Sequence, residues 1–419
     1  MKKHTQSPYE SSEISYKPSG IEWLGEIPQS WENVSIRSCF TESNQRCNTD
    51  SYPLLSVTIA NGIIYQDNIE NKKDISNDDK SNYKIVPLNA VAYNKMRMWQ
   101  GAVGVNTLTT GIVSPAYIVA IPNEKILPNF VSYLFKSKIM IGEFDKNSYG
   151  LCLDMNNLRY DDFRNIKIPL PPLQEQKEIA EFLDSKCEKI QNYIDKKQKL
   201  ITLLQEKKQA LINEAVTKGL NPNIESKNSG IEYLGLIPHH WEVRRMKFMA
   251  SIHNGREQTE IADENGIYPI YGSGGILGKS MYFIYDKPSV LLGRKGTIDK
   301  PLFVEEPFWT IDTMFYTSIS KIVLPKYFYY LCLTIDFQFY ISGSAIPSMT
   351  QYDLANISFA LPPLQEQKEI AAFLDSKVAQ INSVIEKTKR QIKLIKEYKN
   401  TLINEAVCGR INLQKKERI

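Results

Sequence analysis

Two stretches of this sequence combine basic, amide and aromatic side chains with glycines. The first, AVAYNKMRMWQGAVGV, occupies residues 90–105, where apolar alternation leads to a polar group and glycines then permit a tight return. Arg, Lys, Asn and Gln have the donor and acceptor geometry that fits base edges and phosphates. A hairpin with a solvated basic tip explains the same string equally well. The candidate contact residues are Asn94, Lys95, Arg97, Trp99 and Gln100.

The second stretch is YPIYGSGGILG, residues 268–278, followed by VLLGRKGTID at 290–299. Its glycines do not meet the GxGxxG spacing and no P-loop Gly-Lys-Ser/Thr follows, so a nucleotide-binding loop is not indicated. They indicate a flexible turn with close backbone approach, next to a basic pair at a strand end. The candidate phosphate or base contacts are Ser273, Arg294, Lys295 and Thr297.

Two long helices must position these stretches. A run without Gly or Pro begins at Leu173, directly after Pro171 and Pro172, and reaches Lys218; its counterpart runs from Leu364 to Cys408 and stops at Gly409. At ~1.5 Å per residue each helix spans roughly 60 Å, too long and too narrowly apolar for a core helix of a compact domain.

Apolar residues along both runs are spaced alternately four and three apart, which predicts a heptad seam. The polar seam residues Lys197, Lys208, Thr388 and Lys399 either fix the register or snorkel from an imperfect stripe. A whole domain connects the helices, so loop length leaves their orientation open. The expected pairing residues are Ile190, Ile194, Ile201, Leu204, Leu211, Ile381, Ile385, Ile392, Ile395 and Leu402.

The chain is a tandem duplication. SGIEWLGEIPQSWE at 19–32 returns 210 positions later as SGIEYLGLIPHHWE, and LPPLQEQKEIAEFLDSK at 170–186 returns 191 positions later with one change. The inserts between these blocks, Asn33 to Pro169 and Val243 to Leu361, share little sequence. Similar frames with unlike contents favour two reading domains with different targets on one scaffold; two structural domains that drifted after duplication are the alternative.

Length and composition limit the number of domains and the kinds of partner, but they do not identify a function. A chain of 419 residues exceeds one core, and a net charge of +4 is only mildly basic. The first insert holds 15 Lys and Arg against 13 Asp and Glu, and the second holds 11 of each, so nucleic-acid binding would need local patches and a partner.

Other classes of site are not indicated. The six cysteines include no C-x-x-C pair, so neither zinc nor disulfides are predicted, and no cofactor is expected. No stretch is apolar enough to span a membrane, which together with the cysteine pattern predicts a cytoplasmic protein.

The repeated SGIExLGxIPxxWE and LPPLQEQKEIAxFLDSK blocks, with YNKMRMWQG and VLLGRKGTI inside the inserts, resemble the specificity subunits of type I restriction-modification systems. The resemblance covers essentially the whole chain. It implies an α+β fold with two mixed α/β target recognition domains in tandem, separated by two long helices that pair as an antiparallel coiled coil with pseudo-twofold symmetry. The implied boundaries are residues 1–169 for the first recognition domain, 170–219 for the first long helix, 220–360 for a linker and the second recognition domain, and 361–419 for the second long helix and the tail.

The resemblance also implies a function. Each recognition domain would read one half of a bipartite site in double-stranded DNA, and the helices would set the gap. The implied partners are two methyltransferase (modification) subunits and restriction subunits that act as ATP-dependent translocases and nucleases.

The chain itself lacks the signatures of the corresponding enzymes. Its Pro-Pro pairs lie in LPPL, not in the Asn/Asp-Pro-Pro-Tyr/Phe motif of adenine methyltransferases, and it contains no Walker A motif. We therefore expect no catalysis by this chain alone. A coiled-coil structural protein would account for the helices but not for two unlike inserts in matching frames.

Overall fold

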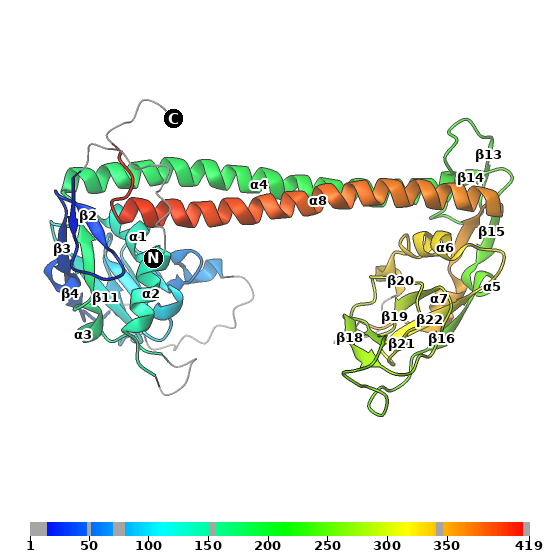
Figure 1. Cartoon of the computed structure of the whole chain (residues 1–419), viewed down its shortest axis with the longest axis horizontal. Helices are drawn as coiled ribbons and strands as arrows, with labels where there is room; N and C mark the ends of the chain where they lie inside the picture. The colour runs from blue at the N-terminus through cyan, green and yellow to red at the C-terminus, as the bar shows by residue number, and fades with distance from the viewer. Residues whose placement is uncertain (1–14, 48–51, 70–79, 151–155, 341–346, 414–419) are drawn as a thin grey trace, which may run out of the picture. The chain divides into compact units, whose positions relative to one another are not determined.

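The computed structural model describes residues 15–47, 52–69, 80–150, 156–340 and 347–413, and the chain divides into two compact units. The first unit combines residues 1–196 with 391–419, and the second consists of residues 197–390. Each long helix therefore contributes one part to each unit (Figure 1).

The first unit is a mixed α/β domain followed by the start of a long helix. Its elements are β1 (Tyr16–Pro18), β2 (Glu26–Pro28), β3 (Glu32–Ser35), η1 (Ile36–Ser38), β4 (Phe40–Ser43), β5 (Leu55–Thr58), β6 (Gly62–Tyr65), η2 (Gln66–Asn68), β7 (Lys84–Val86), β8 (Val91–Asn94), η3 (Met98–Gln100), β9 (Val103–Val105), β10 (Gly111–Val113), β11 (Tyr117–Pro122), α1 (Pro128–Lys136), α2 (Lys138–Lys146), α3 (Tyr160–Phe163), β12 (Lys167–Leu170) and α4 (Leu173–Lys218), which continues into the second unit.

The second unit repeats this order with different lengths. Its elements are β13 (Ser226–Asn228), β14 (Leu236–Pro238), β15 (Glu242–Arg245), α5 (Met246–Met249), β16 (Ala250–Asn254), β17 (Tyr268–Gly272), β18 (Gly275–Ser280), β19 (Ser289–Gly293), β20 (Leu302–Val304), β21 (Trp309–Thr310), β22 (Met314–Ile319), α6 (Pro325–Cys332), η4 (Phe337–Tyr340), α7 (Gln351–Asn356), β23 (Ser358–Leu361) and α8 (Leu364–Val407), which returns to the first unit.

Each unit is built around one four-stranded antiparallel sheet. The strand order is β4-β11-β8-β9 in the first and β16-β22-β19-β20 in the second. Each strand of one sheet has a counterpart at the same place in the other, although the sequences of the strands differ. The duplication seen in the repeated sequence blocks therefore continues through the inserts, where the strand order is the same although the sequences differ.

The two ends of each insert pair with each other. In the first domain β12 pairs with β3, and Asn33 lies opposite Pro169. In the second β23 pairs with β15, and Val243 lies opposite Ala360. A closed strand pair at the base lets each insert begin and end at one place beside the start of its long helix.

The predicted long helices are confirmed almost to the residue. Helix α4 spans Leu173–Lys218 and α8 spans Leu364–Val407, with 46 and 44 residues. In the first unit the start of α4 packs beside the end of α8, and in the second the end of α4 packs beside the start of α8, so the helices run antiparallel. The predicted fold, two tandem mixed α/β domains with an antiparallel helix pair, is confirmed.

The predicted seam is largely removed from solvent. Six of its apolar positions are buried, and the remaining four, Leu204, Leu211, Ile381 and Ile395, are half-buried. Buried Thr388 donates its hydroxyl to Val384 O one turn earlier, so it needs no partner from α4. Lys208 Nζ reaches across to Asn382 Oδ1 at 3.2 Å. The energetic contribution of each seam residue stays a prediction. The six buried positions are Ile190, Ile194, Ile201, Ile385, Ile392 and Leu402.

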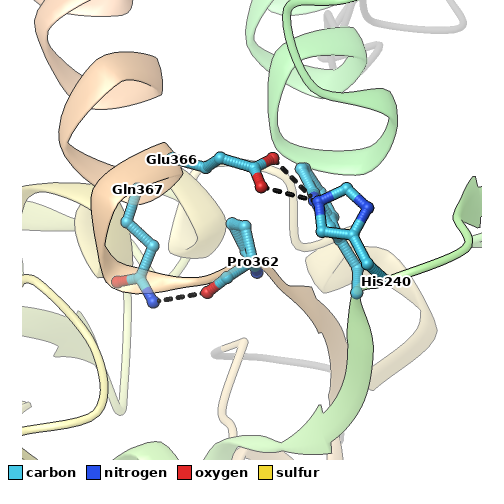
Figure 2. A network of polar contacts seen from close by, with 5 residues as sticks. His240, Pro362, Glu366 and Gln367 are labelled. Carbon is cyan, nitrogen blue, oxygen red and sulfur yellow. Dashed lines mark hydrogen bonds and ion pairs between the residues drawn. The ribbon is translucent and has the colours of Figure 1, made fainter. Parts of the chain in front are cut away.

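The repeated sequence blocks are explained by one set of contacts made twice. Trp31 Nε1 donates to Glu175 Oε2 at 2.7 Å, and Trp241 Nε1 donates to Glu366 Oε2 at 3.0 Å. The second oxygen of each glutamate is also engaged, by Ser30 Oγ at 3.0 Å and by His240 Nε2 at 2.6 Å. Figure 2 shows the second network, where His240 approaches Glu366 at the start of α8.

The glutamine after each glutamate ties a loop to the helix start. Gln367 donates to Pro362 O and Ile322 O and accepts from Leu324 N, the residue that precedes α6 (Figure 2). Gln176 makes the corresponding three bonds in the first unit. Both amides are buried and satisfied, so they lock each long helix to its domain.

Each helix ends against the tryptophan of the frame in its own unit. Gly219 has φ +75°, and a Cβ there would lie 3.2 Å from Trp241 Cζ2. Gly409 has φ +73°, and a Cβ there would lie 2.5 Å from Pro28 Cδ. Glycine is required at both positions because the backbone is left-handed and a ring lies close by. The end of α8 therefore packs against the repeated block at residues 19–32, and the end of α4 packs against the repeated block at residues 229–242.

Candidate nucleic-acid interface

The first candidate stretch forms a hairpin with a wide tip. β8 pairs with β9 in antiparallel register, and residues 95–102 connect them; we call residues 94–101, which begin at the last residue of β8, the first tip. Asn94 Oδ1 accepts from Met96 N at 3.0 Å, and Trp99 Nε1 donates to Met96 O at 3.1 Å. Gly101 closes the tip with φ +88°. The asparagine and the tryptophan are thus held by the tip itself.

A lysine from α1 anchors the first tip. Lys136 Nζ donates to Gly101 O at 2.9 Å, to Ile59 O at 2.8 Å and to Thr58 O at 3.2 Å. These bonds join the first tip to the turn between β5 and β6. Burial lowers the pKa of Lys136 to about 8. No local pattern in the sequence indicates this anchor, because its three acceptors are backbone carbonyls far along the chain.

The second candidate stretch forms the corresponding connection in the second domain. Residues 294–301 join β19 to β20 and form what we call the second tip. Arg294 N and Lys295 N both donate to Thr313 O, at 2.8 and 3.2 Å, and Gly296 N donates to Pro347 O at 2.9 Å. The predicted strand end before Arg294 is confirmed, since β19 ends at Gly293.

The topology makes the two tips equivalent. The first tip follows β8, which lies between β11 and β9, and the second tip follows β19, which lies between β22 and β20. Asn94 is the last residue of β8, and Arg294 comes directly after β19. Sequence reasoning had selected the two stretches separately, on composition alone.

The structure also brings Ser273 to the second tip. The turn between β17 and β18 contains Ser273, whose N donates to Thr313 Oγ1 at 3.3 Å. A Cβ on Gly296 would lie 3.1 Å from Ser273 Oγ, so the two turns are in close approach. Thr297 is half-buried next to this site.

The side chains of the tips divide into held and available groups. Arg294 Nη1 donates to Asp312 O at 3.2 Å, and its guanidinium carbon lies 6.0 Å from the centroid of the Phe315 ring. Arg97 and Lys295 are exposed, and Lys95 and Gln100 are half-exposed. Among the described residues no ion pair involves Lys95, Arg97 or Lys295. Their charges are available to a ligand.

Charges of both signs surround Lys84 in β7. Burial lowers the pKa of Lys84; Glu42 acts in the opposite direction, and Arg46 and Lys95 lower it further. The basic residues Arg46 and Lys95 therefore both lie near Lys84, with the carboxylate of Glu42 also close by.

Extending the first repeat beyond its obvious end identifies residues that sequence reasoning missed. At the same offset of 210 positions, Asn44 and Arg46 recur as Asn254 and Arg256. They are the only identities between residues 33–47 and their counterparts. Alignment of the two copies through the first strand of each insert could have found them.

Other functional groups do not converge in the part of the chain that the structure describes. No group of three or more His, Cys, Asp and Glu residues there could hold a metal ion. No disulfide joins the five cysteines among the described residues, while Cys152 lies outside them. No described helix is long and apolar enough to cross a membrane.

Comparison with known proteins finds the same family in both halves of the chain. The family model described as type I restriction modification DNA specificity domain matches residues 28–202 and 238–394. The type I restriction enzyme MjaVIII specificity subunit of Methanocaldococcus jannaschii is 28% identical, with 73% of this chain and 75% of that protein covered.

Solved structures show a similar fold. A chain from a structure titled for the complex assembly and conformational transition of the type I R-M system has a TM-score of 0.70 and 15% identity, with 91% of this chain and 98% of that chain covered. The HsdS subunit from Thermoanaerobacter tengcongensis has a TM-score of 0.51 and 16% identity, with 92% and 98% covered. At these identities the likeness concerns the fold alone.

Proposed function

Because this chain belongs to the family of type I restriction-modification DNA specificity subunits, we propose that each of its two domains reads one half of a bipartite DNA site and that the helix pair sets the spacer. The chain is a DNA-recognition component and not a catalytic one. In the proposed function, the first tip and the second tip are the parts that reach the DNA.

The observation that carries this proposal is the equivalence of the two tips. They occupy the same position in two sheets of the same strand order, yet one reads NKMRMWQG and the other RKGTIDKP. Side chains that contact bases must differ between domains that read different sequences, whereas the scaffold that presents them can stay the same. The proposed contacts are Asn94, Lys95, Arg97, Trp99, Gln100, Ser273, Arg294, Lys295 and Thr297.

Internal bonding assigns different roles within this set. Lys95, Arg97 and Lys295 have no ion-pair partner among the described residues and are the proposed direct contacts. Asn94 and Trp99 form hydrogen bonds within the first tip and would shape it, and Arg294 bonds Asp312 O outside the second tip and would hold that tip in place. The Arg294 guanidinium still has further N–H donors that can reach a ligand.

The spacer proposal is supported by the length and continuity of the helices. At ~1.5 Å per residue, α4 and α8 each measure about 65–70 Å. Both are continuous, and the proline pairs and glycines lie outside them. A continuous helix pair of this length is suited to set the distance between two reading domains.

Partner recruitment has its own support in the repeat. Leu203 on α4 and Leu394 on α8 are 50% and 54% exposed, and they are equivalent positions at the 191-residue offset. Leu203 belongs to the second unit and Leu394 to the first. We assign one modification subunit to each of these surfaces, and the restriction subunits to the complex so formed.

Two experiments test these proposals. Replacing Asn33–Pro169 with the corresponding insert of a relative should change one half-site in the methylome of a host that carries the complete system, because the cut ends are strand partners. A change in both half-sites would contradict independent reading.

The docking assignment is tested by native mass spectrometry of the complex. The Leu203→Asp and Leu394→Asp variants should each lose one modification subunit, whereas the control Gln205→Asp, at an exposed site, should lose none. Full occupancy in both leucine variants would refute the docking assignment.

A further inference from the structure

We infer that Arg46 and Arg256 are equivalent phosphate contacts, one in each recognition domain, that seat the domain on DNA without reading sequence. This inference rests on the proposed function, in which each domain contacts its own half-site. It assigns a role to two residues that lie outside both tips.

The placement of the two arginines follows from strand direction. β4 and β8 are both antiparallel to β11, so they run parallel to each other and end at the same edge of the sheet. β16 and β19 stand in the same relation to β22. Arg46 follows the end of β4 and Arg256 follows the end of β16, so each lies at the edge from which its tip projects.

The backbone around each arginine is fixed. Arg46 forms a bridge with Lys84, and the adjacent Gln45 O accepts from Ile85 N at 2.9 Å. Arg256 N donates to Thr310 O at 2.8 Å, and Arg256 O accepts from Trp309 Nε1 at 3.0 Å. A side chain on such a fixed backbone is presented with little loss of conformational entropy on binding.

The side chains themselves face solvent. Arg46 and Arg256 are both exposed, and neither takes part in an ion pair among the described residues. Arg46 Nη1 donates to Asn82 O at 2.6 Å, which orients its guanidinium and leaves other donors available.

Each arginine lies close to the basic residues of its tip. In the first domain Arg46 and Lys95 both act on the pKa of Lys84. In the second, Arg256 N binds Thr310 O while Arg294 N binds Thr313 O, in the same short segment before β22. The arginine and the basic residues of the tip are therefore neighbours in each domain.

Identity between the copies indicates what these arginines contact. The tips differ, as base-reading groups of two domains with different targets must. Arg46 and Arg256 are identical within an otherwise unlike stretch, so their ligand has to be a feature common to both half-sites. The sugar-phosphate backbone is that feature, and phosphate contacts position a protein without carrying sequence information. A planar guanidinium fits a phosphate with two hydrogen bonds.

The test measures the salt dependence of DNA binding by the complete complex with its modification subunits. Arg46→Ala should lower the slope of log affinity against log salt by about 0.9, so that its affinity deficit shrinks by roughly 3- to 4-fold between 50 and 200 mM salt. The fold loss should be the same on cognate and random-sequence duplexes, and the methylated sequence should be unchanged. Arg256→Ala should behave in the same way.

Matched controls lie at the opposite ends of the same strands. Arg37 precedes β4 and Lys247 precedes β16, and both are exposed, so Arg37→Ala and Lys247→Ala make the same charge change away from the proposed surface. Both controls should keep the wild-type slope. Arg46→Lys should also keep it, because the charge remains, and Arg256→Ala carries the test in the second domain should Arg46→Ala unfold.

Three results decide the matter. An unchanged slope in folded Arg46→Ala, or a slope lost equally in Arg37→Ala, would overturn the phosphate assignment. A changed base preference at the first half-site would also overturn it, because the residue would then read sequence. If the slopes change as expected while the insert exchange leaves both half-sites as they were, the phosphate contacts stand and half-site reading fails.

Discussion

Trp31 donates its indole N–H to Glu175 at 2.7 Å, across 144 positions of sequence, and thereby fastens the first recognition domain to the start of α4. Trp31 is 2% exposed, so its indole is buried and Glu175 is the acceptor that its N–H uses in the folded protein. Glu175→Ala should therefore lower the free energy of unfolding by about 1–3 kcal/mol. Urea unfolding of the purified protein measures this change.

The matched control for this prediction is Glu181→Ala, on the same helix. Glu181 is exposed and its nearest ion-pair distance, to Lys177, is 4.0 Å, so its removal should change stability by less than about 0.5 kcal/mol. Equal losses in the two variants would mean that the indole contact adds nothing beyond general helix effects.

The second tip offers a test that separates contact from support. Lys295→Ala should weaken binding to DNA with no change in stability, because the exposed lysine has no ion pair among the described residues. Arg294→Ala should weaken binding and also lower the melting temperature, because its guanidinium bonds Asp312 O. Loss of a base contact should relax one position of the second half-site by roughly 1–3 kcal/mol.

Binding titrations on duplexes with single base changes, together with melting curves, check these outcomes. The first half-site should stay as it is in the wild type. A folded Arg294→Ala, Lys295→Ala double variant with wild-type affinity and salt slope would show that the second tip does not touch DNA.

The helix pair predicts a movable spacer. Lys208 contacts Asn382, so Leu204 lies close to the position of Ile385 on the opposite helix. Inserting one heptad after Leu204 and one after Ile385 preserves the seam and lengthens the pair by ~10 Å, or about three base pairs at ~3.4 Å each. Methylome sequencing should show both half-sites unchanged and a wider gap, or lost activity where the added rotation cannot be accommodated. An active variant with the original gap would remove the ruler role.

Lys136 predicts a dependence of stability on pH. Burial lowers its folded-state pKa to about 8 from a usual value of 10.5, so between these values the unfolded chain binds more protons than the folded protein. The free energy of unfolding should therefore rise with pH across this interval, relative to a Lys136→Met variant that cannot titrate. Below pH 8 both states carry the charge, and the difference between wild type and variant should be flat.

Urea unfolding of wild type and Lys136→Met at several pH values between 7 and 11 isolates this term, because the other titrating groups cancel in the difference. Lys138→Met is the control, since Lys138 is exposed at the start of the next helix. Parallel curves for wild type and Lys136→Met would contradict the lowered pKa. The variant should also bind the first half-site more weakly, because Gly101 O in the first tip loses its donor.

Local rules of the chain were sufficient to predict the long helices. Their hydrogen bonds join residues four apart, so proline pairs before Leu173 and Leu364, a run free of Gly and Pro, and glycines at 219 and 409 fix both ends. The heptad spacing predicted the buried seam for the same reason. The repeated blocks and the family resemblance could also be recognised from the sequence, because comparing the residues of the two copies does not require the structure.

Only the tertiary structure decided how the inserts present their side chains. The strands of each sheet are three to six residues long and pair with partners far along the chain, so no local pattern determines their order. That order made the first and second tips equivalent and placed Arg46 and Arg256 beside them. It also showed that Arg294 bonds Asp312 O and that Lys136 supports the first tip, because these hydrogen bonds depend on backbone carbonyls whose positions are set by long-range packing.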